Sequence, residues 1–227
     1  MERGLYIAAS GMLAEQVRQN QIANDLANAS TPGYKADRSS QRSFSEVLLH
    51  NSATGQDIGS LGTGVTIAQT TTDLDPAALR DTGEPLDFAV EGTGFFAVRT
   101  QQGVRYTRNG QFMRSPQGTL ADSLGNQVLG QNGKPVSVKA DGTAATNPGV
   151  FNLTNVRKVG DSLFTGTAAG KATGTVRNGA LESSGTDPAR AMIDMITSER
   201  SYEAGQKAIR TIDETLQKAV STVPSIT

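Results

Sequence analysis

Cysteine and tryptophan are absent from this chain of 227 residues, and histidine occurs once, as His50. Without cysteine the chain can form no disulfide, no thiolate metal site and no cysteine nucleophile. A metal site would have to use carboxylates and carbonyls, which suit only hard cations. We therefore expect neither a metal nor a cofactor.

Aromatic residues are scarce, at 5%, and hydrophobic residues make up 36% of the chain. Such a chain buries limited apolar area per residue, so we expect thin domains or surfaces completed by other subunits. The 21 Lys+Arg and 22 Asp+Glu residues give a formal net charge of −1. This balance predicts no nucleic-acid binding. No apolar run approaches the roughly 20 residues that span a bilayer, so we expect no membrane insertion.

The first residues are a poor match to a secretory signal. Glu2 stands beside Arg3, and the apolar run before Glu15 is too short. If the protein leaves the cytoplasm, we expect it to do so without a cleaved signal peptide.

Helical periodicity predicts one long helix from about Arg3 to Asn28, because apolar residues recur there at intervals of three and four. Its apolar positions include Leu5, Ala8, Met12, Ile22 and Leu26. Pro32 and Gly33 then favour a turn that ends the helix.

A second helix is predicted from Asp187-Pro188 to about Val220, since aspartate is a good N-cap and proline suits the first helical position. One series with a seven-residue repeat is Met195, Tyr202, Ile209 and Leu216, and a second, mostly small series is Ala191, Ser198, Gly205, Ile212 and Ala219. Together they form a coiled-coil-like seam. We expect the two terminal helices to pack on each other and on equivalent helices of neighbouring subunits. The alternative is a helical hairpin within a monomer.

Short alternating segments separated by turn signals predict a compact antiparallel β region from about Leu86 to Phe164. The turn signals are Gln102-Gly103, Asn109-Gly110, Gln117-Gly118, Gly125-Asn126, Asn132-Gly133 and Asp141-Gly142. Before this region, a capping-box pattern at Ser43 and Glu46 predicts a short helix over 47–49. After it, the Gly, Ala and Thr of 165–175 predict a flexible connector.

The predicted fold class is therefore α+β: long N- and C-terminal helices, coiled-coil-like, flank a mainly antiparallel β domain with an extended linking region. The expected division is 1–33, N-terminal helix of an inner assembly domain; 34–85, extended linking region with a hairpin; 86–165, β-rich outer domain; 166–186, return linker; 187–227, C-terminal helix of the inner domain.

The motifs that could carry chemistry are weak. Gly92-Thr93-Gly94 resembles a dinucleotide fingerprint, but a strand and not a helix is predicted after it. Gly170-Lys171 lacks the earlier glycine and the following Ser or Thr of a phosphate loop. His50 is expected on the surface, and no sequence pattern pairs two carboxylates for acid–base catalysis.

Asn20, Asn24 and Asn28 recur at intervals of four and so share one face of the first predicted helix. Asparagine is a poor helix former, so this stripe suggests side-chain hydrogen bonds to a partner that set register. A solvated face is an equally good interpretation.

Three ordered motifs resemble the flagellar rod and hook family. Residues 22–35, IANDLANASTPGYK, match the signature I-A-N-N-L-A-N-x-x-T-x-G-F-K with Asp25 and Tyr34 as departures. GTGFF at 92–96 with YTRNGQF at 106–112 resembles the middle motif, and MITSERSYE at 195–203 the C-terminal helix. LESS at 181–184 stands where the family has L-E-x-S-N-V-D, and Gly185 breaks that pattern.

This resemblance implies a structural, non-enzymatic rod subunit, more similar to the distal rod protein than to the hook, whose larger insertions have no room here. It implies a helical homopolymer that forms a hollow, torque-transmitting shaft. Other rod and hook subunits would be partners, and surrounding basal-body ring proteins are a further candidate. It also implies a location in the basal body outside the cytoplasmic membrane, in the periplasmic and cell-wall zone, reached by type III export.

The periodic positions and the asparagine stripe together predict the contacts between subunits. The predicted interface residues are Leu5, Met12, Asn20, Ile22, Asn24, Leu26, Asn28, Met195, Tyr202, Ile209, Ile212 and Leu216. Two other classes remain open from the residues alone: a cell-wall glycan hydrolase, which needs two convergent carboxylates in the β domain, and a monomeric adhesin-like module.

Overall fold

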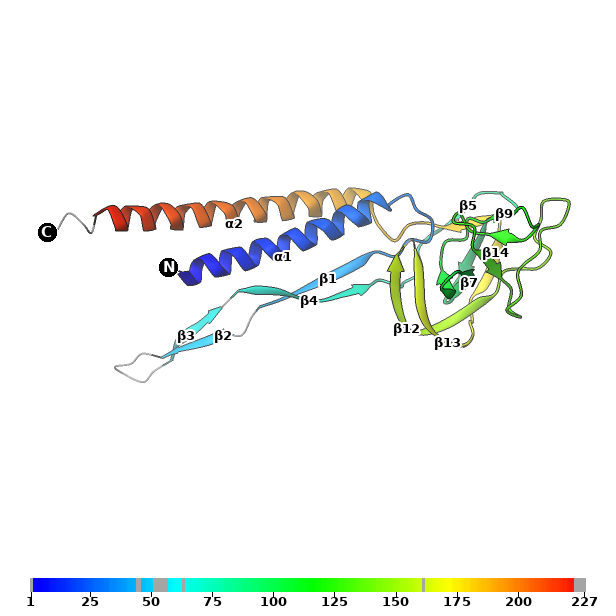
Figure 1. Cartoon of the computed structure of the whole chain (residues 1–227), viewed down its shortest axis with the longest axis horizontal. Helices are drawn as coiled ribbons and strands as arrows, with labels where there is room; N and C mark the ends of the chain where they lie inside the picture. Colours follow the sequence, from blue (N-terminus) through cyan, green and yellow to red (C-terminus); the bar gives the residue numbers. More distant parts are fainter. Residues whose placement is uncertain (1, 44–45, 51–56, 63, 161, 223–227) are drawn as a thin grey trace. The chain divides into compact units, whose positions relative to one another are not determined.

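A computed structural model describes residues 2–43, 46–50, 57–62, 64–160 and 162–222. The chain forms two compact units. The first contains both terminal helices and the segment 37–71, and the second contains 27–36 and 72–187. The fold is α+β, with a helix at each end of a mainly antiparallel β region, as the sequence predicts (Figure 1).

The two helices of the first unit are α1, Glu2–Ala27, and α2, Pro188–Thr222. α2 begins at a proline, where the missing N–H costs no helical hydrogen bond. α1 ends in a turn in which the Thr31 N–H donates to the Asn28 carbonyl at 3.0 Å. The observed ends of α1 and α2 agree with the ends predicted from the sequence to within two residues.

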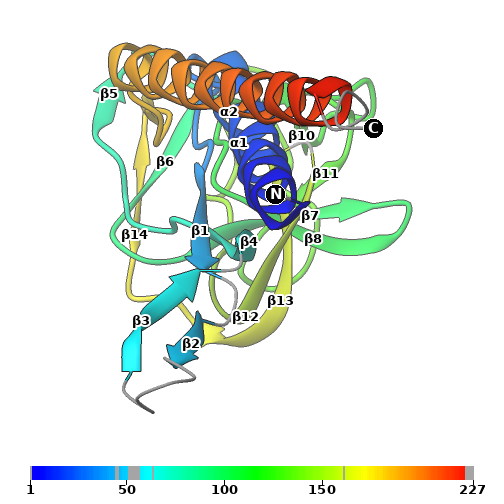
Figure 2. The ribbon, with the colours of Figure 1, turned by 90° about the vertical axis from the view of Figure 1, so that its left-hand side faces the viewer.

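α1 and α2 lie side by side and run antiparallel (Figures 1 and 2). Three near contacts show the direction, because early α1 positions meet late α2 positions. A Cβ at Gly4 would lie 3.3 Å from Ile212, a Cβ at Gly205 would lie 2.8 Å from Met12, and Ser198 bonds Glu15.

A two-stranded ribbon packs on α1 in the same unit. It consists of β1, Asp37–Ser43, and β4, Val65–Thr72. The Val65 N–H donates to Ser10 Oγ at 3.3 Å, and the Gln21 amide donates to the Asp37 carbonyl.

Between the two strands of the ribbon the chain forms a hairpin of β2, Glu46–His50, and β3, Asp57–Gly62, where Val47 pairs with Leu61. The short helix predicted over 47–49 is therefore wrong. A capping box favours a helix, but here pairing with the next strand supplies the backbone hydrogen bonds instead. The side chain of His50 lies outside the described part of the chain.

The second unit is built on a seven-stranded sheet of order β12-β13-β8-β7-β11-β10-β9, in which β12 also pairs with β7. All its described pairings are antiparallel. The strands are β7 Phe95–Thr100, β8 Gly103–Thr107, β9 Met113–Arg114, β10 Leu120–Ala121, β11 Gln127–Leu129, β12 Val150–Gly160 and β13 Leu163–Lys171.

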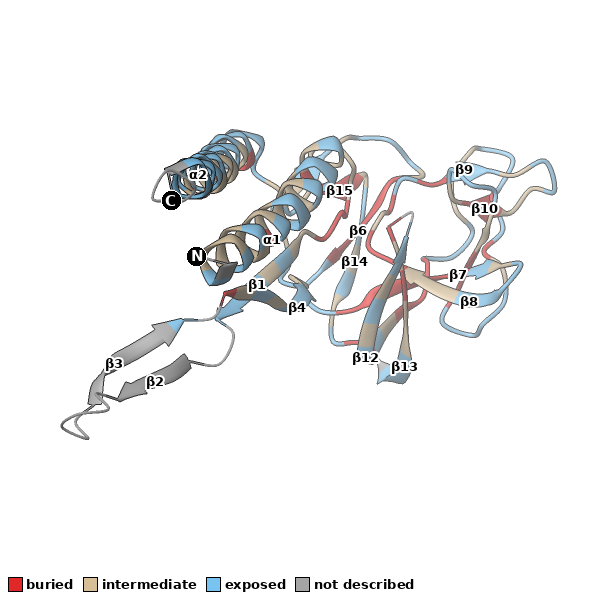
Figure 3. Ribbon diagram, turned by 60° about the vertical axis from the view of Figure 1, so that its left-hand side comes forward, coloured by how far each residue is buried: buried red, intermediate tan, exposed pale blue. Residues whose placement is uncertain are grey.

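Two further antiparallel pairs complete this unit. β6, Phe88–Glu91, pairs with β14, Thr175–Asn178, and β5, Leu79–Asp81, pairs with β15, Ala180–Glu182. Figure 3 shows buried residues on β6 and β15 of these pairs and on β7 and β10 of the sheet. The main core cluster consists of Phe88, Val90, Phe96, Val98, Phe112, Leu120, Val128, Val136, Val138, Val150 and Ala172.

The flexible connector predicted over 165–175 is also wrong for most of its length, because β13 runs to Lys171. Ala168 pairs with Leu153 and Thr167 with Thr154 of the long strand β12. Small residues with low β propensity are accepted because the strand's partner is already in place. Most of the predicted turn glycines, in contrast, have positive φ, for example 76° at Gly118 and 71° at Gly133.

Candidate assembly site

The contact between α1 and α2 depends on the small residues of the α2 seam. Ser198 is fully buried, and its hydroxyl donates to Glu15 Oε2 at 2.5 Å. Gly205 lies so close to α1 that a Cβ there would approach Met12 Cγ to 2.8 Å. The close helix approach that the small-residue series predicts thus occurs within one chain.

Most of the predicted interface residues are half-buried on the two helices. They are Leu5, Met12, Ile22, Leu26, Met195, Tyr202, Ile209, Ile212 and Leu216. Met12 and Ile212 come close to the other helix within the chain, and the contribution of all nine to contacts between subunits stays a prediction.

Replacing Gly205 by leucine is expected to lower the stability of the helix pair by about 1–3 kcal/mol, because the added side chain overpacks a seam that has no room for it. Thermal unfolding followed by far-UV circular dichroism measures the effect. The control is Ala204→Leu on the neighbouring exposed position, for which a change within about 0.5 kcal/mol is expected. Equal midpoint temperatures of thermal unfolding for the two variants would contradict close packing at Gly205.

The structure divides the asparagine stripe. Asn20 and Asn24 are exposed on α1, whereas Asn28 lies beyond the end of the helix in the second unit. There the Asn28 carbonyl accepts the Thr31 N–H at 3.0 Å and the Ser184 hydroxyl at 2.9 Å. Asn28 therefore ties the end of α1 to the segment that precedes α2.

Sequence reasoning missed the large apolar residues that remain exposed on the helices. On α1 they are Tyr6, Leu13 and Val17, and on α2 they are Met192, Ile193, Ile196 and Val220. Tyr6, Leu13 and Asn20 recur at intervals of seven residues. A search for a further seven-residue repeat in α1 could therefore have identified the exposed apolar residues of this helix.

A buried cluster of charged side chains in the second unit also escaped the sequence prediction. Lys35 Nζ lies 2.6 Å from Glu182 Oε1, and Arg108 Nη1 lies 3.0 Å from Glu182 Oε2. All three residues are at most 2% exposed. One carboxylate thus binds two cations in an interior where each charge alone would be costly.

Backbone groups add hydrogen bonds to this cluster, although the buried Arg108 Nε has no partner among the described residues. Lys35 Nζ donates to the Asp75 carbonyl at 2.6 Å, and Arg108 Nη2 donates to the Gly92 carbonyl at 2.9 Å. The Ala77 N–H donates to Glu182 Oε1 at 2.8 Å, and the Arg108 guanidinium lies 5.2 Å from the centre of the Phe95 ring. The carbonyl oxygens and the ring stabilise the cation that the single carboxylate leaves uncompensated.

The cluster joins two of the sequence motifs described above to the 181–184 segment. Lys35 ends the first motif, Arg108 lies in the middle one, and Glu182 lies in the Leu181–Ser184 segment. Gly33 adds a backbone link, since its N–H donates to the Glu182 carbonyl at 2.8 Å. The cluster therefore fastens the segment after α1 and the segment before α2 to the β sheet.

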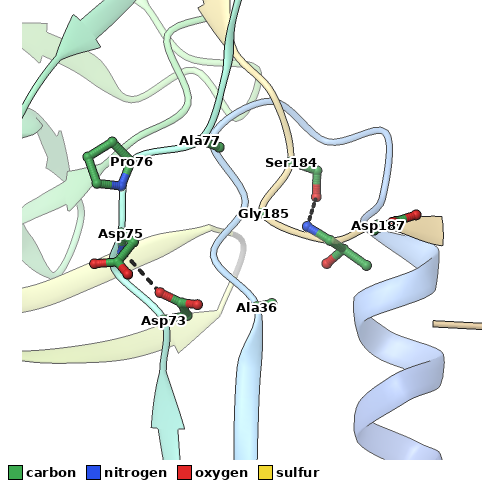
Figure 4. A pocket seen from close by; sticks show the side chains of 9 residues that line it. Ala36, Asp73, Asp75, Pro76, Ala77, Ser184, Gly185 and Asp187 are labelled. Carbon is green, nitrogen blue, oxygen red and sulfur yellow. Dashed lines mark hydrogen bonds between the residues drawn. The ribbon is translucent and has the colours of Figure 1, made fainter. Parts of the chain in front are cut away.

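A shallow pocket lies beside this junction (Figure 4). It is lined by Ala36, Asp73, 75–77 and 184–187. Asp73 Oδ1 accepts the Asp75 N–H at 3.1 Å, and Ser184 Oγ accepts the Thr186 N–H at 3.2 Å. These polar groups stabilise the turns that carry them, and nothing in their arrangement indicates a reaction.

The described residues contain neither a candidate metal site nor a candidate membrane-spanning helix. Within those ranges, no three His, Cys, Asp or Glu side chains come together as a cation site would require. Neither described helix is long and apolar enough to cross a membrane.

Three family models match successive parts of the chain. Residues 5–35 match "Flagella basal body rod protein", and residues 89–155 match "Flagellar hook protein FlgE/F/G D1 domain". Residues 177–222 match "Flagellar basal body rod FlgEFG protein C-terminal". The three matched segments contain Lys35, Arg108 and Glu182 respectively.

Full-length relatives agree with these matches. The flagellar basal-body rod protein FlgG of Bacillus subtilis is 29% identical over 97% of this chain and 99% of the relative. FlgG of Buchnera aphidicola subsp. Schizaphis graminum is 30% identical over 94% of this chain and 97% of the relative. The rod protein FlgF of Salmonella typhimurium is 32% identical over 94% and 95%.

The fold and these matches define a structural protein of the bacterial flagellum and not an enzyme. The chain belongs to the flagellar basal-body rod protein family. It is a structural rod subunit, located in the flagellum, that assembles with other rod and hook subunits.

Proposed function

We propose that this chain polymerises with copies of itself, through its terminal helices, into a hollow shaft that transmits torque. The observation that carries the proposal is the half-burial of the heptad seam. Two helices cover only one side of each other, so residues such as Tyr202 and Ile209 keep part of their apolar surface in water. Neighbouring helices in a polymer would bury the remainder.

The proposed subunit interface is the set of twelve residues predicted from the sequence, supplemented by the exposed apolar residues of α1 and α2. In this proposal 1–33 and 187–227 supply the inner assembly domain, 34–85 the linking region, 86–165 the outer β domain and 166–186 the return segment. The buried Lys35–Glu182–Arg108 cluster would transmit force between the helices and the β domain, because it ties both connecting segments to the sheet.

We further propose a place in the distal rod, as a subunit of the FlgG kind. The FlgG relatives from Bacillus and Buchnera, which align over nearly their whole length, support this assignment. The Salmonella FlgF relative, at 32% identity, supports a proximal rod subunit as the second candidate. The subunits would be exported by the flagellar type III apparatus. The polymer would lie in the periplasmic and cell-wall zone and contact basal-body ring proteins.

The test is complementation of cells that lack this gene. The full chain is expected to restore motility and rods visible by electron microscopy, whereas a chain without 187–227 is expected to restore neither, because it lacks one side of the seam. The matched control keeps α2 and exchanges an exposed charge pair, Glu203→Lys with Lys207→Glu, and is expected to restore both. A truncated chain that still entered rods would overturn the proposal.

A further inference from the structure

After Arg3, the outer face of α1 lacks the charges that a solvated helix face normally carries. Eight positions from Tyr6 to Asn24 are exposed, and none of them is charged. Three are large apolar residues, with Tyr6 75%, Leu13 64% and Val17 47% exposed. A helix face of this composition is typical of a surface that another protein covers.

Two partners within the same unit contact α1 beside these exposed residues. α2 lies against the side of α1 that carries Gly4 and Met12, and the β1–β4 ribbon lies against the side that carries Ser10 and Gln21. At 100° per residue, Val17 is about 20° and Leu13 about 60° from Ser10, so both lie next to the ribbon contact and on the side of α1 away from α2. Figure 3 shows exposed positions along α1.

α2 differs from α1 along most of its outer face. Of the 17 exposed positions from Glu199 to Ser221, eight are charged, which is typical of a solvated face. Only the beginning of α2 exposes a group of large apolar residues, namely Met192 at 52%, Ile193 at 64% and Ile196 at 51%. These three residues form the second group of exposed large apolar side chains on the helices.

We propose that the α1 outer face, Tyr6–Leu13–Val17, binds the beginning of α2, Met192–Ile193–Ile196, of a second copy of this chain. This inference rests on the proposed function and names the surfaces that polymerisation uses. Burial of both apolar groups drives the contact. The uncharged amide of Asn20, which continues the α1 face, selects the register.

The positions of the two surfaces explain why the contact propagates. Met12 lies beside Gly205, and Glu15 lies beside Ser198. Because the helices run antiparallel, Ile193 lies beside an α1 position about nine residues after Leu13. The two exposed apolar groups are therefore separated by roughly 14 Å along the helix axis. Two different surfaces at different heights make a heterologous contact. Each added copy leaves one surface free, so the assembly stays open and grows.

The absence of native cysteine allows a direct test by disulfide cross-linking. Leu13→Cys and Ile193→Cys variants, each with a single cysteine, are expressed together in the cells that make this chain and then oxidised. We expect a 13–193 dimer on an immunoblot. Dimers linked 13–13 instead would show a closed α1–α1 contact and overturn the inference, as would rods that form without any 13–193 product.

A charge placed on the α1 face provides the second test. Leu13→Glu is expected to reduce incorporation into rods at least about tenfold, which corresponds to about 1.4 kcal/mol of lost association energy. Ala204→Glu, which adds the same charge to the charged face of α2, is expected to stay within about twofold of the unmodified chain. Circular dichroism of both purified variants checks that the helices are retained.

The outcomes separate the inference from the proposed function. An unmodified chain that never enters rods would overturn the proposed function, and the inference with it. Normal incorporation of Leu13→Glu, in cells where the unmodified chain forms rods, would overturn the inference alone.

Discussion

Replacing Glu182 by glutamine is expected to lower the free energy of unfolding of the β unit by about 3–5 kcal/mol, because it leaves two buried cations without their carboxylate. Lys35 and Arg108 both bond Glu182 within 3.0 Å, and all three side chains are almost completely buried. Glutamine keeps the shape of the side chain, so the change tests charge and not volume. Urea unfolding followed by tyrosine fluorescence measures the difference.

The matched control for this variant is Asp81→Asn. Asp81 also forms an ion pair, with Arg177 at 2.8 Å, but the two side chains are 70% and 48% exposed. Water screens an exposed pair, so the expected loss is below about 1 kcal/mol. A Glu182→Gln chain as stable as the Asp81→Asn chain would show that the cluster does not hold the β unit together.

Replacing Gly33 by alanine is expected to destabilise the same junction by about 4 kcal/mol or more, among the largest effects a single substitution produces. Gly33 has φ 65°, and a Cβ there would lie 2.3 Å from the carbonyl carbon and oxygen of Arg108. The obstacle is backbone, which cannot rotate away as a side chain could. The hydrogen bond from the Gly33 N–H to the Glu182 carbonyl would be lost with the displacement.

Gly118→Ala separates the two causes of this effect. Gly118 has φ 76°, close to that of Gly33, but no atom lies within 4 Å of the position of a Cβ. Only the left-handed backbone penalty of about 1–2 kcal/mol is then expected. If urea unfolding gives the same midpoint for both variants, the close approach of Gly33 to Arg108 contributes nothing to stability.

The elements that sequence analysis predicted well are those with local signals. The heptad residues of α2 and its Asp187-Pro188 start require only the neighbouring few residues, and the helix begins at Pro188. The positive φ of Gly118 and Gly133 follows from turns of four residues. Such signals depend only on residues within a few positions of one another, so they can be recognised in the sequence.

The elements that it missed depend on partners outside the segment itself. The strand over Leu163–Lys171 has a weak composition of its own and pairs with β12, the strand that comes just before it. Lys35 and Glu182 are 147 positions apart. No spacing in the sequence indicated that this lysine and this glutamate would form an ion pair.

By itself, then, the sequence determined the two terminal helices, the antiparallel β region and membership of the rod and hook family. Tertiary structure alone decided which α1 stripe meets α2, which stripe stays exposed, and where Lys35, Arg108 and Glu182 meet. The physical reason is that helix and turn propensities act between near neighbours, whereas burial and ion pairing depend on which distant segments the folded chain brings together.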